Sequence, residues 1–229
     1  MNGRAVFAIF SLSLSLIACS GNKQNVAQNP QPTASLANET GLPLPENATI
    51  IDARAVHETI DPSQSSGSAL AEAGKGTYNG HEVVASADAS QQDLETWLAS
   101  VPVPEGMKKT DPGAKIKVGS DTLTTMAHRY GIDYIAFVSP NGKGATVVVM
   151  DPKIVTGKLG AIVSMLDKYN SLPEPMRQAM DSQIKQRTGF SIAELTDKSA
   201  PVGAAINAVK EFRNSDKRAI ILVSGEKAQ

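Results

Sequence analysis

The 229-residue chain is predicted to adopt an α+β fold, with a small, mostly antiparallel sheet in its N-terminal half and helices in its C-terminal half. Two apolar runs, at 133–139 and 145–150, flank Pro140-Asn141-Gly142-Lys143-Gly144, the clearest hairpin signal in the chain. Beyond residue 151, apolar residues recur at helical spacing. The run AIILVS at 219–224 then predicts a returning terminal strand, apolar enough for burial on both faces. Strands early, helices late and a final strand are typical of the α+β class.

Two strands are expected before the first helix. They are TIIDARAV at 49–56 and YNGHEVVASA at 78–87, and Asn79-Gly80 predicts a tight turn near the start of the second. The residues between them, 61–76, are rich in Ser, Gly and Ala. We expect this segment to form a polar loop.

Two helices are expected between these strands and the hairpin. Ser90 is a good N-cap for a helix over 91–99, whose apolar spacing places Trp97 in the core. Ser120 or Asp121 is expected to cap the second helix, which runs through Tyr130 and ends at Gly131.

The C-terminal half is predicted to contain four helices. They cover 154–169, 174–187, a short segment that starts with the Ser191–Glu194 capping box, and 203–214. A single sheet that includes the terminal strand is favoured over two separate domains divided near residue 151.

The first nineteen residues have the pattern of a secretory signal. Arg4 and the terminal amine precede an uncharged, mostly apolar segment, 5–18, which is shorter than the roughly 20 residues of a membrane-spanning helix. The segment closes with Leu16-Ile17-Ala18-Cys19, which contains the chain's one cysteine. This tetrapeptide resembles the lipobox of bacterial lipoproteins. The alternative is an ordinary signal peptide in which the lone cysteine is accidental.

The lipoprotein resemblance implies cleavage after Ala18 and acylation of Cys19. Two or three acyl chains would hold the protein stably on a membrane, since a single chain holds only marginally. Ser20 stands where, in the enterobacterial sorting rule, an aspartate retains lipoproteins in the inner membrane, so the resemblance favours the outer membrane, on its periplasmic face. The expected organisation is a signal peptide at 1–18, a lipidated cysteine with a disordered, polar tether at 19–41, and an α+β domain at 42–229.

Composition and spacing argue against several functional classes. With 22 basic and 23 acidic residues the chain lacks the basic excess of a nucleic-acid binder. His57, His81 and His128 are far apart in sequence, so no metal site has local support and no cofactor is expected. His81-Glu82-Val83-Val84-Ala85 starts like a zincin motif but lacks the second histidine. No motif therefore supports an enzyme. A pair of carboxylates that folding brings together cannot be recognised from the sequence.

One further segment resembles half of a LysM module, a family that binds the N-acetylglucosamine chains of peptidoglycan and chitin. Residues 118–132 read VGSDTLTTMAHRYGI, against a family pattern of roughly G-D-T-L-x-x-I-A-x-x-Y-G-V. The resemblance would assign glycan binding to Asp121, Thr122 and Tyr130. In the competing interpretation Leu123, Met126, Ala127 and Tyr130 are simply the buried face of a helix.

Three functional hypotheses follow. The leading one is a non-catalytic envelope lipoprotein that binds a protein or another envelope component. The second is a peptidoglycan-binding module, favoured by a βααβ unit over residues 115–150 and disfavoured by a β-hairpin there. The third is a periplasmic enzyme, favoured by a deep pocket that gathers His81 or His128 with carboxylates.

Overall fold

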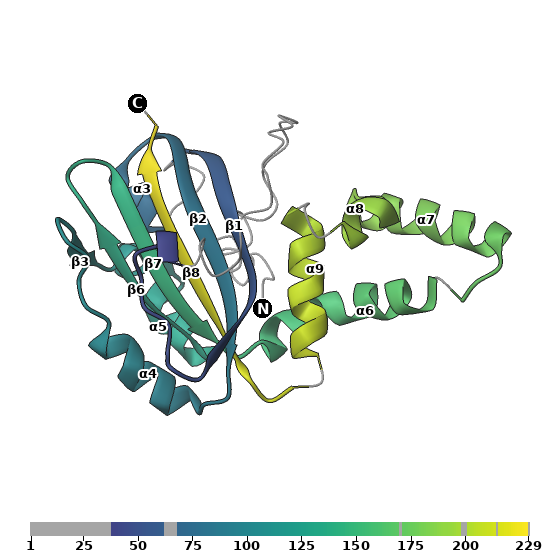
Figure 1. Cartoon of the computed structure of the whole chain (residues 1–229), viewed down its shortest axis with the longest axis horizontal. Coiled ribbons are helices and arrows are strands. Elements are labelled where there is room, and N and C mark those ends of the chain that lie inside the picture. Colours follow the sequence, from purple (N-terminus) through teal and green to yellow (C-terminus); the bar gives the residue numbers. More distant parts are fainter. Residues whose placement is uncertain (1–37, 62–67, 170, 198–200, 214, 229) are drawn as a thin grey trace. The chain divides into compact units, whose positions relative to one another are not determined.

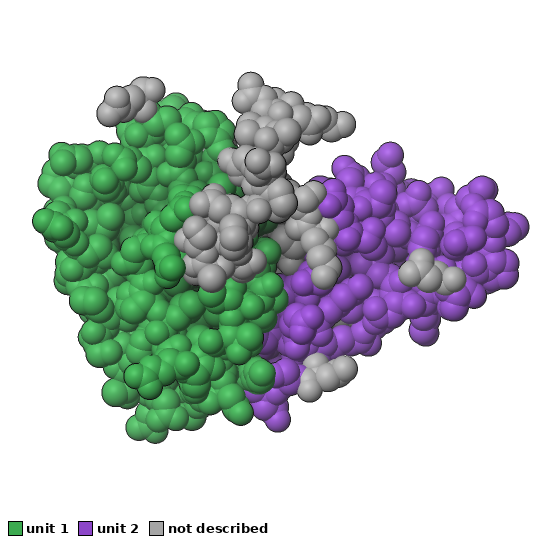
Figure 2. All heavy atoms as spheres, viewed as in Figure 1, with its two compact units in different colours: residues 1–151, 217–229 green, residues 152–216 purple. Residues whose placement is uncertain are grey.

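The computed structural model describes residues 38–61, 68–169, 171–197, 201–213 and 215–228. The chain divides into two compact units, one of residues 1–151 and 217–229 and one of residues 152–216 (Figure 2). Ala18, Cys19 and most of the predicted tether lie outside the described residues. The end of that predicted tether is part of the fold, because Glu39 pairs with His81 and Thr40 is buried.

The first unit is built on a six-stranded antiparallel sheet, which confirms the α+β class (Figure 1). Both predicted N-terminal strands and the predicted hairpin are present. The strands, in their order across the sheet, are β1 (Ala48–Ile60), β2 (Gly76–Ala87), β8 (Arg218–Lys227), β7 (Lys143–Met150), β6 (Ile132–Val138) and β3 (Lys108–Thr110).

The predicted terminal strand, β8, lies in the middle of this sheet between β2 and β7. Leu222 pairs with Val83 on one side and Val147 on the other, and all three side chains are fully buried. The apolar character of AIILVS therefore reflects a central position.

Helix α4 (Gln91–Ser100) contributes Leu94 and Leu98 to the core of this unit. It starts, as predicted, at Ser90, whose hydroxyl accepts from the Asp93 amide in a capping box. Trp97 departs from its prediction: it is only half-buried and packs against the margin of the core. The helical spacing identified the right face, but Trp97 lies at its edge.

The predictions for Asn79-Gly80 and for the loop at 61–76 are also wrong. Asn79-Gly80 forms no turn, because β2 runs through both residues and Gly80 pairs with Val56 and Gly225. A side chain at Gly80 would lie 1.9 Å from the Ser224 carbonyl oxygen, so the glycine permits close strand approach. The predicted loop at 61–76 contains a short helix, α3 (Ala69–Ala73), whose Leu70 is buried against Gly144 and Gly225.

Short elements connect α4 to the hairpin. They are β3, the 3₁₀ helix η1 (Pro112–Lys115), the two-stranded β4 (Lys117–Val118) and β5 (Asp121–Thr122), and α5 (Leu123–Arg129). The N-cap of α5 is Thr122, in place of the predicted Ser120 or Asp121, because the Thr122 hydroxyl accepts from the Thr125 amide. Gly131 follows the helix with φ +70°, as its predicted C-terminal role requires.

The second unit is helical. It comprises α6 (Lys153–Tyr169), α7 (Glu174–Thr188), α8 (Ile192–Thr196) and α9 (Pro201–Phe212), close to the four predicted ranges. The Ser191–Glu194 capping box is formed, and Val163, Ile184 and Leu195 are among its core residues. No helix within the described ranges combines the length and apolarity needed to cross a membrane.

Candidate functional site

Strand β6 carries two neighbouring polar side chains, Asp133 and Tyr134. Successive side chains of a strand point to opposite faces of its sheet, so the two residues begin separate polar clusters. Asp133 belongs with Glu95 and His128, and we call these three residues the His128 cluster. Tyr134 belongs with Asp111 and Thr124, and we call these the Asp111 network.

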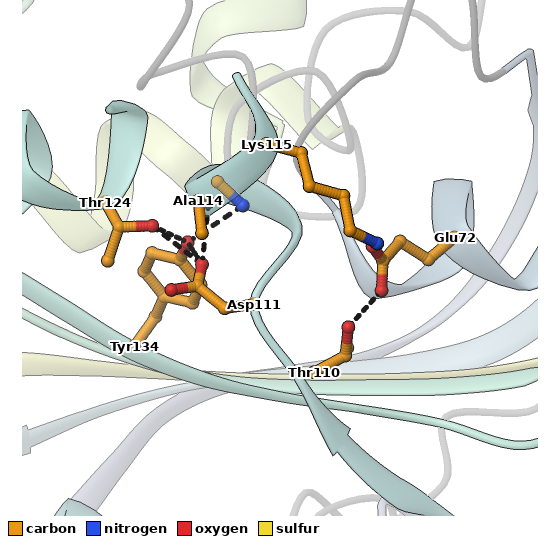
Figure 3. A network of polar contacts seen from close by, with 8 residues as sticks. Glu72, Thr110, Asp111, Ala114, Lys115, Thr124 and Tyr134 are labelled. Atoms are coloured by element: carbon orange, nitrogen blue, oxygen red, sulfur yellow. Dashed lines mark hydrogen bonds and ion pairs between the residues drawn. The ribbon is translucent and has the colours of Figure 1, made fainter. Parts of the chain in front are cut away.

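In the Asp111 network several donors surround one carboxylate oxygen of Asp111 (Figure 3). Asp111 Oδ1 lies 2.6 Å from the Thr124 hydroxyl, 2.6 Å from the Tyr134 hydroxyl and 3.0 Å from the Ala114 amide nitrogen. The two hydroxyls are also 2.7 Å apart. Each hydroxyl has one proton, so two of these three oxygen–oxygen contacts are hydrogen bonds at any moment. The network joins η1, α5 and β6.

The Asp111 network holds its carboxylate ionised. Burial on its own would raise the pKa of Asp111, but the hydrogen bonds from Thr124, Tyr134 and the backbone outweigh it and the pKa lies below its ordinary value. The pKa of Tyr134 is raised, first by burial and then by its hydrogen bond to the Asp111 carboxylate. Tyr134 therefore keeps its proton and Asp111 keeps its charge. Neither group is poised to transfer a proton near neutral pH.

A second group of contacts lies on the other side of η1 (Figure 3). Glu72 of α3 accepts from the Thr110 hydroxyl and pairs with Lys115, with a nitrogen–oxygen distance of 2.6 Å. Burial opposes the charged form of Glu72, yet the hydrogen bonds from Lys115 and Thr110 lower its pKa overall. These contacts, with the Asp111 network, fix η1 against α3 and the sheet.

The His128 cluster has a different chemistry. Glu95 comes from α4, His128 from the last turn of α5 and Asp133 from β6. One ligand-type atom from each residue lies within 4.8 Å of the other two. His128 Nδ1 is 2.6 Å from Asp133 Oδ1, and the histidine side chain is 65% exposed while that of Asp133 is 15% exposed.

Gln91 completes the surroundings of the His128 cluster. Its Nε2 donates to Asp133 Oδ2 over 2.6 Å, so one carboxylate oxygen is held from α4 while the other faces His128. The hydrogen bond to Asp133 raises the pKa of His128, and the charges of Asp133 and Glu95 add to this against a small opposing effect of burial. The buried Gln91 Oε1 has no hydrogen-bond partner among the described residues.

The other two histidines are held by ordinary contacts. His81 Nε2 lies 2.7 Å from Glu39 Oε2, and His57 Nδ1 contacts Asn79 Oδ1. Glu82, next to His81 in the zincin-like segment, is buried and pairs with Arg54 at 2.8 Å across β1 and β2. Burial raises the pKa of Glu82 more than the attraction of Arg54 lowers it. Glu82 thus serves as an internal charge partner within the sheet.

The LysM resemblance leads us to expect two helices in this region, and the structure contains one of them. Helix α5 is present, but residues 132–150 form the β6–β7 hairpin, the outcome stated above as disfavouring the glycan hypothesis. Asp121 pairs with Arg129 at 2.9 Å, and Thr122 accepts from the Thr125 amide as the N-cap. Tyr130 is 38% exposed, so the prediction of its burial with Leu123, Met126 and Ala127 is wrong for Tyr130 alone.

Sequence reasoning did not identify the members of the His128 cluster as a group. The short elements β3, η1, β4 and β5 lie between Glu95 on α4 and His128 on α5. The packing of α4 and α5 against β6 brings the two residues together (Figure 1). The one local signal was the His128–Asp133 spacing across the turn at Gly131. The third hypothesis expected a deep pocket around His81 or His128; the structure gathers His128 with two carboxylates, but at the surface.

In comparisons with known proteins, no family model, no curated protein and no solved structure matches the chain.

Proposed function

We propose that this protein is a lipoprotein of the bacterial outer membrane, held on the periplasmic face through Cys19, whose α+β domain is a non-catalytic binding or accessory module of the envelope. The observation that carries the proposal is the lipobox-like Leu16-Ile17-Ala18-Cys19 at the end of a short apolar segment that follows Arg4. Cys19 is also the one cysteine of the chain, so lipidation leaves no free thiol.

The polar contacts of the described residues support a binding role over a catalytic one. Asp111 and Tyr134 are held in their resting ionisation states, and Glu82 is neutralised by Arg54 inside the sheet. The pKa of Asp111 is lowered and that of Tyr134 is raised, both away from neutrality, whereas general acid–base catalysis needs a pKa near the working pH. Burial raises the pKa of Glu82, but this side chain lies inside the sheet, where it contacts Arg54. The partner of this module is either a protein or another component of the envelope.

The test is acylation of Cys19 in a Gram-negative host. Metabolic labelling with a clickable fatty acid is expected to mark the wild-type chain and to leave Cys19→Ser unlabelled. Fractionation is expected to find the wild type with the outer membrane and Cys19→Ser away from membranes. Ser20→Asp is the matched variant, because it keeps the acylated cysteine and is expected to move the chain to the inner membrane.

Two outcomes would contradict the proposal. A wild-type chain without fatty-acid label would remove the anchor, and a Cys19→Ser chain that still sediments with membranes would show that another segment holds it. Sedimentation of the Cys19→Ser chain with purified peptidoglycan, lost in Tyr130→Ala, would instead revive the glycan hypothesis.

A further inference from the structure

We propose that the His128 cluster is a binding site for a divalent transition-metal ion, with Zn²⁺ as the best-fitting probe. The site comprises Glu95, His128 and Asp133, one residue each from α4, α5 and β6. It is independent of the proposed lipid anchor, since none of its residues lies in the N-terminal segment.

The donor set matches such an ion. One imidazole nitrogen and two carboxylate oxygens suit Zn²⁺ and its first-row neighbours, whereas Ca²⁺ and Mg²⁺ prefer oxygen-only sites. The two carboxylates bring two negative charges, which a divalent cation neutralises. Three protein ligands with a fourth position open to water is the arrangement of zinc sites that are not purely structural.

The ligand atoms are near one another but must rearrange to hold an ion. Zn–N and Zn–O bonds of about 2.0–2.2 Å place tetrahedral ligand atoms roughly 3.4 Å apart. The three ligand-type atoms here already lie within 4.8 Å of one another. The His128 side chain, at 65% exposed, has room to turn so that a cation replaces its hydrogen bond to Asp133 Oδ1.

Gln91 orients one of the proposed metal-binding carboxylates, which supports the proposal independently. Metal-binding carboxylates are usually oriented by a further hydrogen bond, and Gln91 Nε2 supplies one to Asp133 Oδ2. The same amide carries the buried Oε1 that has no hydrogen-bond partner among the described residues.

Binding of Zn²⁺ to the full chain tests the proposal. The Cys19→Ser background is used throughout, because a free thiol would compete for the metal. Titration calorimetry with ZnCl₂ is expected to give one site per chain, and the affinity is expected to fall at least tenfold in His128→Gln and in Glu95→Gln. Fluorescence of Trp97, the sole tryptophan and two residues after Glu95 on α4, provides a second readout with Co²⁺ or Cu²⁺.

His57→Gln is the matched control, because it removes an exposed histidine on β1 and should leave the affinity within about twofold of the parent. Circular dichroism without metal checks that each variant is folded, and His128, as an exposed residue, is the substitution least disturbing to the fold. The proposal is overturned if the parent chain binds no Zn²⁺, or if His128→Gln binds it as tightly as the parent. In either case the cluster is a surface ion pair only.

Discussion

The two polar clusters that start from neighbouring residues of β6 differ in how their carboxylates are satisfied. Asp111 Oδ1 receives the Thr124 and Tyr134 hydroxyls and a backbone amide, all neutral donors supplied by the fold itself. Asp133 accepts from the Gln91 amide through Oδ2, and it shares with Glu95 one exposed imidazole, that of His128. The first cluster is complete without a ligand, whereas the second lacks a fixed positive charge. Stability should therefore depend on the Asp111 network and ligand binding on the His128 cluster.

The largest effect is expected from Asp111→Ala. It removes the acceptor of two hydroxyls and the N-cap of η1, so the free energy of unfolding should fall by about 2 kcal/mol. Chemical denaturation of the full chain measures this change. Glu105→Ala, at an exposed turn position, is the control and should change stability by less than about 0.5 kcal/mol. Equal results for the two variants would break the comparison, because the network would then contribute nothing.

The contribution of Asp111 to the free energy of unfolding should depend on pH, which tests the comparison further. The folded-state pKa of Asp111 lies below its ordinary value of 3.8, so the stabilisation is fully present above that value and is lost as the pH falls through the folded pKa. The stability difference between wild type and Asp111→Asn should be constant from about pH 5 to 7 and shrink below about pH 4. Denaturation curves at several pH values measure it. A difference that persists unchanged at pH 2 would show that the carboxylate charge is not the cause.

The smallest effect is expected from His128→Gln in the absence of metal. An exposed ion pair contributes about 0–1 kcal/mol, and this one is mostly exposed on the histidine side, so the free energy of unfolding should change by less than about 0.5 kcal/mol. Thermal unfolding with a chelator present measures it. A loss comparable to that of Asp111→Ala would mean that both clusters are structural.

The sequence predicted those parts of the fold that are decided within a few residues. The N-cap at Ser90, the Ser191–Glu194 capping box, the turn at 140–144 and the glycine after α5 are local features, and the elements they delimit were placed correctly. Gly80 shows the limit. The dipeptide Asn79-Gly80 is a turn signal in isolation, but the close approach of β8, far away in sequence, decides its actual role.

The site was less accessible to prediction for the same reason. His128 was noted as an isolated histidine, and Glu95 is one of several polar residues on α4. Their proximity to Asp133 depends on how α4 and α5 pack against β6. The exposure of Tyr130 was missed likewise, because helical spacing places it near the buried face, whereas it is the C-cap of α5, beyond the last full turn.

The central place of β8 has a consequence for the order of assembly. Strands β1 and β2 form one hairpin and β6 and β7 another, and within the part of the chain that the structure describes β8 is the strand that joins them. During synthesis, residues 152–216 emerge before β8 does. Until β8 arrives, β2 and β7 each present an open edge, which is the kind of surface on which chains pair wrongly. A chain that crosses a membrane before folding would therefore expose the edges of β2 and β7 until β8 follows. The length of the helical unit sets how long these edges stay exposed.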